Sequence, residues 1–347
     1  MTMNKKISIN MISIADSVKG QGVGSAYIEQ VALIKDYASD LFDVSVNDLV
    51  GHHDINHFHN TTPDVFFRKL NKKTVTVIYC HFLPDTLEGS IKLPSIVMKA
   101  FSRYIVEIYK SADRLVVVNP CFKKELVKYG IRMEKIYYIP NYVSKDTFYP
   151  KQKEEINLIR EKYGLKPDDF VVMGCGQVQT RKGVLDFAKV AKKCPNIQFI
   201  WAGGFSFGKI TDGYDQLSKL VENPPENVHF LGIVEREEMN DIYNMSDLLF
   251  MPSYNELFPM TILEAVNVQK PILLRDLDLY KDILFKNYIK ANNNEEFASF
   301  IQKFKEDSTF YQLGVDYSIS ISKYYSKEHV LSLWKQFYVD AYNEKNR

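Results

Sequence analysis

Short runs rich in β-branched and aromatic residues alternate along the chain with longer segments whose apolar residues recur every three or four positions. This alternation predicts parallel sheets with helices on both faces, because a helix connects each strand to the next parallel strand. In the first part of the chain we expect strands near 5–14, 43–47, 54–59, 74–81, 114–119 and 135–140. We expect helices between them, near 25–39, 63–70, 94–111 and 120–129.

A second series of the same kind follows, with strands near 170–174, 198–202, 228–231, 248–251 and 271–274 and helices near 183–192, 214–221, 237–244 and 259–268. The polar, Pro-containing segment 141–155 separates the two series and has the composition of a connection between domains. From residue 294 we expect two or three helices, the last with an apolar stripe that must be buried: Val330, Leu333, Trp334, Phe337, Tyr338 and Ala341. The sequence therefore predicts an α/β chain with two doubly wound domains, 1–148 and 149–325, and a final helix, 326–347, that packs back towards the first domain.

Composition narrows the class of protein. Of the 347 residues, 46% are hydrophobic and 25% are charged, which excludes a disordered chain and a coiled-coil rod. The formal net charge is +1, so no strong electrostatic field favours nucleic acid as a partner. No apolar run is long enough to span a bilayer, and no signal-peptide core follows Lys5 and Lys6. We therefore expect a cytoplasmic protein that contacts a membrane only peripherally.

Two glycine-rich loops follow predicted strands, where ligands bind in open α/β sheets. The first contains Gly20, Gly22 and Gly24 before a helix, but Ser25 stands where the dinucleotide fingerprint requires Gly, so a tight turn without a ligand stays an alternative. The second places Gly174 and Gly176 before Arg181, Lys182 and Gly183 at the start of a helix. Cations at the positive end of a helix are unfavourable unless an anion joins them, which favours a diphosphate site over a solvated surface loop.

The segment LLFMPSYNELFPMTILEAV carries two glutamates at the end of a strand and in the following helix. Glu256 lies in the loop, Pro259 suits the first turn of the helix, and Glu264 follows one to two turns later. The N–H groups of residues 258–261 would be unpaired at the helix start, and the two carboxylates could accept hydrogen bonds from vicinal hydroxyls. The alternative is an ordinary pair of surface glutamates.

At this point the chain resembles the retaining glycosyltransferases of the GT-B fold, family GT4. Glu256 to Glu264 is similar to the E-x7-E motif of that family, residues 177–183 to its RKG-type phosphate clamp, and IPNYVSKDTFYP at 139–150 to its hinge, although Tyr142 replaces the hinge Gly. The resemblance implies two Rossmann-like domains facing across a cleft. It implies that Arg181 and Lys182 hold the donor diphosphate, Glu264 the ribose, and Glu256 the transferred hexose, with His81 beside the reacting sugar. The full set of expected donor-binding residues is Gly22, Gly176, Gln177, Arg181, Lys182, Phe258, Pro259, Met260, Thr261 and Glu264.

More narrowly, SADSVKGQGVGSAYIEQV, HFLPDTLEGSIKLP and SADRLVVVNPCF resemble Gram-positive enzymes that add a second sugar to α-glucosyl-diacylglycerol, which anchors lipoteichoic acid. This resemblance implies UDP-galactose as the donor, with UDP-glucose as the alternative, and a glycolipid acceptor. Other acceptors, namely diacylglycerol, a polysaccharide or another glycan, stay open. Residues 92–111 combine apolar residues with Lys92, Lys99, Arg103 and Lys110, as in a helix lying on the inner face of an anionic cell membrane, although core helices share this pattern.

For the mechanism we expect a front-face substitution with retention, in which Arg181 and Lys182 stabilise the charge on the departing phosphate. We expect neither a cofactor nor an essential metal. Asp276 and Asp278 spell a D-x-D, but they follow a late strand, and the histidines at 52, 53, 57 and 59 lack further ligands for zinc. Two rivals are a non-catalytic nucleotide-sugar or glycolipid binding module and an NAD-dependent dehydrogenase, the latter disfavoured because both glycine loops miss the fingerprint.

Overall fold

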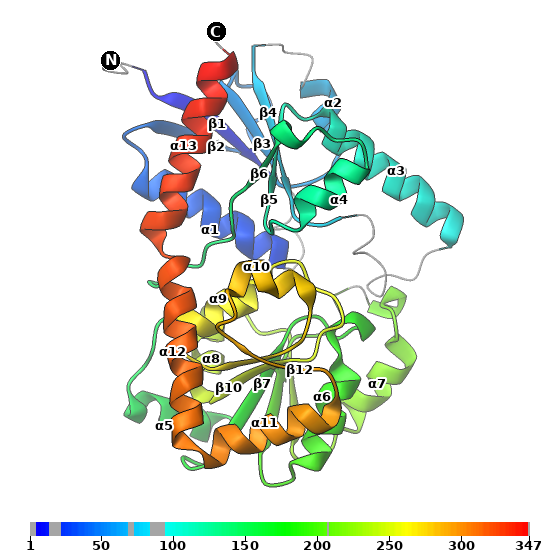
Figure 1. Cartoon of the computed structure of the whole chain (residues 1–347), viewed down its shortest axis with the longest axis vertical. Helices are drawn as coiled ribbons and strands as arrows, with labels where there is room; N and C mark the ends of the chain where they lie inside the picture. The colour runs from blue at the N-terminus through cyan, green and yellow to red at the C-terminus, as the bar shows by residue number, and fades with distance from the viewer. Residues whose placement is uncertain (1–4, 14–21, 69–72, 84–93, 207, 346–347) are drawn as a thin grey trace.

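The computed structural model describes residues 5–13, 22–68, 73–83, 94–206 and 208–345. Within these residues, a six-stranded parallel sheet has the order β2-β1-β3-β4-β5-β6. Its strands are β1 (Ile7–Ile12), β2 (Phe42–Val46), β3 (Ile55–Phe58), β4 (Val75–Cys80), β5 (Arg114–Val117) and β6 (Ile136–Tyr138). The helices between them are α1 (Gly22–Tyr37), α2 (Asp64–Arg68), α3 (Ser95–Ser111) and α4 (Phe122–Lys128). We call this sheet and the helices on it the first domain (Figure 1).

The second domain repeats the plan with a parallel sheet of order β12-β11-β10-β7-β8-β9. Its strands are β7 (Val171–Cys175), β8 (Gln198–Ala202), β9 (Val228–Gly232), β10 (Leu248–Met251), β11 (Ile272–Arg275) and β12 (Ile289–Ala291). Its helices are α5 (Lys153–Lys162), α6 (Val184–Lys193), α7 (Tyr214–Glu222), α8 (Arg236–Met245), α9 (Met260–Asn267), α10 (Lys281–Leu284), α11 (Asn294–Glu306) and α12 (Ser308–Tyr324). The expected doubly wound α/β architecture is confirmed.

The inner strands of both sheets are buried nearly throughout, which explains their continuous apolar sequences, whereas the edge strands β2, β6, β9 and β12 are only partly buried. In each sheet the strand order reverses once, between β1 and β3 in the first and between β7 and β10 in the second. Ligands of open α/β sheets bind at such reversals, beyond the carboxyl ends of the strands. The fold thereby singles out the loops after β7 and β10.

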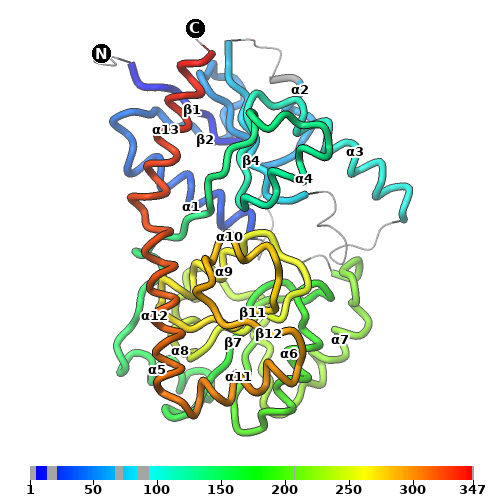
Figure 2. The backbone as a smooth tube through the Cα atoms, in the orientation of Figure 1, coloured from blue at the N-terminus to red at the C-terminus, as the bar shows by residue number. Residues whose placement is uncertain are grey.

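The chain passes between the domains twice, once after β6 and once between α12 and α13 (Lys327–Lys345), as Figure 2 shows. α13 lies against the first domain, where the hydroxyl of Tyr338 accepts from Nε2 of Gln30 at 3.0 Å and Nη1 of Arg114 donates to the Phe337 carbonyl at 3.3 Å. Trp334, Phe337 and Tyr338 bury the apolar stripe of this helix there.

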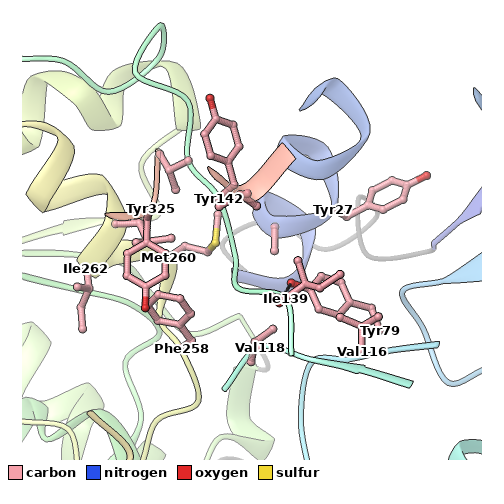
Figure 3. Close-up of a cluster of buried hydrophobic side chains, with 14 of the residues drawn as sticks. Tyr27, Tyr79, Val116, Val118, Ile139, Tyr142, Phe258, Met260, Ile262 and Tyr325 are labelled. Carbon is pink, nitrogen blue, oxygen red and sulfur yellow. Dashed lines mark hydrogen bonds between the residues drawn. The ribbon is translucent and has the colours of Figure 1, made fainter. Parts of the chain in front are cut away.

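One apolar cluster continues across the boundary between the domains. Figure 3 shows residues of the first domain, such as Tyr79 and Ile139, in the same cluster as Phe258 and Met260 of the second domain and Tyr325 at the second crossing. The domains therefore share a packed contact beside the loops that carry the candidate site. Among the described residues, no helix is both long and apolar enough to cross a bilayer.

Candidate active site

The predicted phosphate loop and Glu256 meet at the strand reversal of the second sheet. Arg181 and Lys182 follow β7, and Glu256 follows the neighbouring strand β10. Lys182 Nζ lies 2.6 Å from Glu256 Oε1, and Arg181 Nη1 lies 3.4 Å from Oε2 of the same carboxylate. Arg181 Nη1 also donates to the Asn255 carbonyl at 2.6 Å. Residues more than seventy positions apart in the sequence thus form one charged cluster. We call Arg181 and Lys182 the cation pair.

Burial makes this cluster electrostatically strong. The side chain of Glu256 is 4% exposed, and those of Lys182 and Arg181 are 11% and 16% exposed. Burial alone would raise the pKa of Glu256, but the adjacent Lys182 and Arg181 hold it below its usual value. Burial lowers the pKa of Lys182, and the neighbouring guanidinium acts in the same direction. Both cations contact the same carboxylate, and an anion bound beside them would add a further negative partner.

Glycines allow the two loops to approach each other. Gly183 has a φ of 70°, and a Cβ placed there would come 2.3 Å from the carbonyl oxygen of Pro252, the residue after β10. Gly176 has a φ of 130°, and a Cβ there would lie 3.2 Å from Lys182 Cε. A larger residue at either position would strain the backbone; at Gly183 it would press against Pro252, and at Gly176 against Lys182. Gln177 is half-buried in the same loop.

The start of α9 provides backbone groups rather than side chains. Phe258 and Met260 are 3% and 5% exposed, and Figure 3 shows both side chains within the apolar cluster between the domains. Pro259 is the N-cap, and no side chain caps the helix by a hydrogen bond. The expected use of the main chain of residues 258–261 therefore stays compatible with the geometry, with Thr261 half-buried. From the first domain, Nδ2 of Asn141 donates to the Phe258 carbonyl at 3.0 Å and ties this loop in place.

Glu264 lies in α9 and is 5% exposed. Its Oε1 accepts from Arg236 Nη1 at 3.0 Å, and its Oε2 accepts from the Tyr243 hydroxyl at 2.7 Å. Arg236 also bonds to Glu29, which belongs to α1 of the first domain. We did not predict Arg236, Tyr243 or Glu29 from the sequence. Polar residues in amphipathic helices are normally expected to face solvent, and no local sequence pattern indicates their distant partners.

His81 follows β4 and is 6% exposed. It clusters with His57, which lies in β3, and with His59, which follows β3. His59 Nδ1 lies 3.1 Å from His81 Nε2, and His57 Nδ1 lies 2.7 Å from the hydroxyl of Tyr338 in α13. Burial lowers the pKa of His57 and of His81 to about 3 and that of His59 well below its usual value. The imidazoles are therefore neutral at physiological pH, so His81 can contact a ligand through a hydrogen bond rather than through a charge.

The first glycine loop falls only partly within the described residues. Gly20 lies outside them, and Gly22 is the first residue of α1. A Cβ on Gly22 would come 4.0 Å from Met260 Cγ, so the N-terminal ends of α1 and α9 face each other across the domain boundary. Both ends carry partial positive charge, which adds to the field of the cation pair.

The predicted membrane helix divides into two parts. In the first turns of α3, Ile96, Val97 and Phe101 are 81%, 49% and 38% exposed, and Lys99 and Arg103 are exposed among them. Ile105 and Ile108 are fully buried, so the last turns of α3 fit the core helix that the sequence left open as the alternative. Lys110 pairs with Glu107 at 3.0 Å. Lys92 lies outside the described residues.

Both carboxylates of the D-x-D motif, Asp276 and Asp278, form ion pairs with lysines. Asp276 Oδ2 lies 2.8 Å from Lys290 Nζ, and Asp278 Oδ1 lies 2.6 Å from Lys281 Nζ. Over the described part of the chain, no group of three or more His, Cys, Asp or Glu side chains could hold a metal ion. Tyr142, at the position of the family's hinge glycine, is buried and is absent from the described non-glycine residues with positive φ. The hinge therefore does not require a glycine here.

Comparison with known proteins agrees with this geometry. Residues 155–317 match the family described as "Glycosyl transferases group 1", and residues 42–147 match "Glycosyltransferase Family 4". The chain is 45% identical to the "Alpha-galactosylglucosyldiacylglycerol synthase" of Streptococcus pneumoniae over 96% of its own length and 90% of that protein.

The chain belongs to the group 1 glycosyltransferases. It is also 28% identical to the "Processive diacylglycerol alpha-glucosyltransferase" of Acholeplasma laidlawii, over 84% of this chain and 86% of that one. Among solved structures, HepE of Anabaena in complex with UDP-glucose superposes with a TM-score of 0.76 at 15% identity, covering 96% of this chain and 100% of that one. The expected GT-B fold of this glycosyltransferase is thereby confirmed.

Proposed function

We propose that this glycosyltransferase transfers a hexose, with galactose favoured over glucose, from a UDP-sugar to α-glucosyl-diacylglycerol. The product would be the diglycosyl-diacylglycerol that anchors lipoteichoic acid. The observation that carries the proposal is the 45% identity, over 96% of the chain, to a synthase named for that glycolipid. The buried cation pair at the strand reversal supports a nucleotide diphosphate as the donor's leaving group.

The proposed division of labour follows the contacts of each residue. Arg181 and Lys182 would bind the diphosphate and stabilise the charge that develops on it as the bond to the sugar breaks. Glu256 orients both cations, and a carboxylate can still accept a hydrogen bond from a hexose hydroxyl. Glu264 would bind the ribose hydroxyls, and neutral His81 would donate or accept one hydrogen bond beside the reacting sugar.

We infer a retaining reaction in which the acceptor hydroxyl attacks from the face that UDP leaves. The acceptor proton would pass to the departing phosphate oxygen, so the glycosidic bond to UDP breaks as the new one forms. The cation pair would provide the positive charge that other sugar transferases take from a divalent ion, and we therefore propose that no essential metal is required. Transfer in excess EDTA at the rate seen without EDTA would support this part of the proposal.

We further propose that the exposed turns of α3 lie on an anionic membrane surface, where the acceptor resides. Ile96 and Val97 would enter the interface, and Lys99 and Arg103 would face lipid headgroups. This placement would make the protein a peripheral one on the inner face of the cell membrane.

The decisive experiment offers UDP-galactose and UDP-glucose separately to the purified protein with α-glucosyl-diacylglycerol micelles. We expect release of UDP and a disaccharide lipid, identified by mass and by linkage analysis, with UDP-galactose as the better donor. Binding of UDP without any transfer would favour a nucleotide-sugar binding module instead. Transfer only to diacylglycerol or to a soluble glycan would overturn the acceptor.

A further inference from the structure

One arginine connects the two domains at the candidate donor site. Arg236, the first residue of α8, donates from Nη1 to Glu264 of the second domain at 3.0 Å. Its Nη2 donates to Glu29 of α1 in the first domain at 2.5 Å. The guanidinium fork thus holds a carboxylate of each domain at the same time, a geometry that a lysine ammonium does not reproduce.

The surrounding contacts include the connection between the domains as well. Glu29 Oε2 accepts from the backbone N–H of Ser144 at 3.0 Å, and the guanidinium carbon of Arg236 lies 5.1 Å from the centre of the Phe148 ring. Both Ser144 and Phe148 belong to the first crossing between the domains. Arg236 therefore contacts both domains and the segment about which they would rotate.

The contact between the domains depends on the charge of Arg236, which lies between two buried carboxylates. The side chains of Glu29 and Glu264 are each 7% exposed, and that of Arg236 is 23% exposed. Burial raises the pKa of Glu29, Arg236 opposes the shift, and the charge of Glu264 adds to it. Without the guanidinium, two buried carboxylates would repel each other across the domain boundary.

Glu264 keeps capacity for a ligand in this arrangement. A carboxylate has about four lone-pair positions, and the described contacts use one on each oxygen, for Arg236 and for Tyr243. The remaining positions can accept two vicinal hydroxyls, while Arg236 and Tyr243 fix the plane of the carboxylate.

We infer that Arg236 is a positioning residue that orients Glu264 for the nucleotide and, through Glu29, couples nucleotide binding to closure of the two domains. This inference rests on the proposed function, since it assumes a nucleotide-sugar donor. Closure would bring His81 of the first domain towards the donor held by the second, so a weaker link would slow transfer.

The test compares Arg236→Met, Glu29→Gln and the control Lys151→Met. Arg236→Met keeps an unbranched side chain but removes the guanidinium and with it the link, whereas Glu29→Gln is nearly isosteric and leaves the Arg236–Glu264 pair intact. The control removes the 2.6 Å ion pair of Lys151 with Asp241, which also lies in α8. For each full-length variant we would measure the Kd for UDP by calorimetry, kcat and KM for transfer, and the radius of gyration with and without UDP by small-angle scattering.

For Arg236→Met we expect the Kd for UDP to rise and kcat to fall, each by about 5-fold to 150-fold, the usual range of coupling between sites. For Glu29→Gln we expect the Kd for UDP to stay within about twofold while kcat falls at least about fivefold and UDP no longer compacts the molecule. Lys151→Met should behave as the wild type.

Wild-type kcat and UDP-induced compaction in Glu29→Gln would overturn the inference, and so would wild-type UDP binding in Arg236→Met. If Arg236→Met does not fold, as judged by circular dichroism, the Glu29→Gln result decides alone. Failure of the wild-type protein to bind UDP would instead refute the proposed function, which keeps the two conclusions distinguishable.

Discussion

Glu256 lies between Arg181 and Lys182 where little solvent reaches. Desolvation makes each of these charges costly, and the ion pairs of Glu256 with the two cations offset part of that cost. A phosphate group bound beside Arg181 and Lys182 would bring a further opposite charge. We therefore expect a bound diphosphate to stabilise the folded protein.

Replacing Arg181 by alanine should reduce the rate of transfer by about 10²-fold or more, by analogy with the loss of one preorganised donor to a developing negative charge. UDP release from UDP-galactose in the presence of the glycolipid acceptor measures the effect. Lys189→Ala is a suitable control, because Lys189 is 65% exposed on the adjacent helix α6. Undiminished transfer by Arg181→Ala would show that the phosphate clamp has been assigned to the wrong residue.

Sequence reasoning named the residues of the candidate site that belong to recognisable motifs. Arg181 and Glu256 could be predicted separately because each follows a strand, where ligands bind in open α/β sheets, and the family resemblance added Glu264. Arg236 and Glu29 could not, because each lies in a helix with an ordinary charge pattern and the two are 207 positions apart. Only the relative placement of the domains brings them into contact.

Among the elements, α5, α10 and β12 escaped the sequence analysis, and α10 has only four residues, Lys281–Leu284. The segment predicted as a connection contains the start of α5, whose first turn is charged and whose Leu158 is 68% exposed, so its apolar periodicity is weak. β12 is a three-residue strand at the edge of the second sheet, too short for a pattern. The strong apolar runs and the amphipathic helices, by contrast, predicted the remaining strands of both sheets.

The exposed turns of α3 lead to a prediction at the scale of this element. Ile96→Asp should weaken binding to vesicles that contain an anionic phospholipid by about tenfold or more, because a fully inserted Ile side chain contributes roughly 1.5–3 kcal/mol. Co-sedimentation with vesicles measures the binding. Leu158→Asp changes a similarly exposed apolar residue on α5 and should leave vesicle binding unaltered. Equal binding by Ile96→Asp and wild type would refute the proposed membrane contact.

At the scale of the whole molecule, the two sheets, the apolar cluster between them and α13 form one connected structure. The histidine cluster lies where these parts meet, since His57 contacts Tyr338 and packs near Trp334 at a ring distance of 5.4 Å. Its three imidazoles are neutral when folded and exposed to solvent when unfolded. The stability of the entire fold is therefore linked to their protonation.

The free energy of unfolding should fall as the pH drops from about 6.5, the ordinary pKa of histidine, towards about 3, the lowered pKa of His57 and His81. Over this window the unfolded chain binds protons that the folded chain excludes, so stability is complete above the window and is lost on acidification. The slope can reach about 1.4 kcal/mol per pH unit for each histidine. Urea unfolding at pH 7, 6 and 5 measures it, and His57→Phe should give a shallower slope. A midpoint that does not change between pH 7 and pH 5 would contradict this expectation.

The position of α13 also bears on how the protein is made. Trp334 and Tyr338 complete the core of the first domain although they are translated after the whole of the second domain. The first domain therefore leaves the ribosome with part of its interior uncovered, and α13 closes that interior only after residues 327–345 have emerged. The order of synthesis and the order of assembly thus differ.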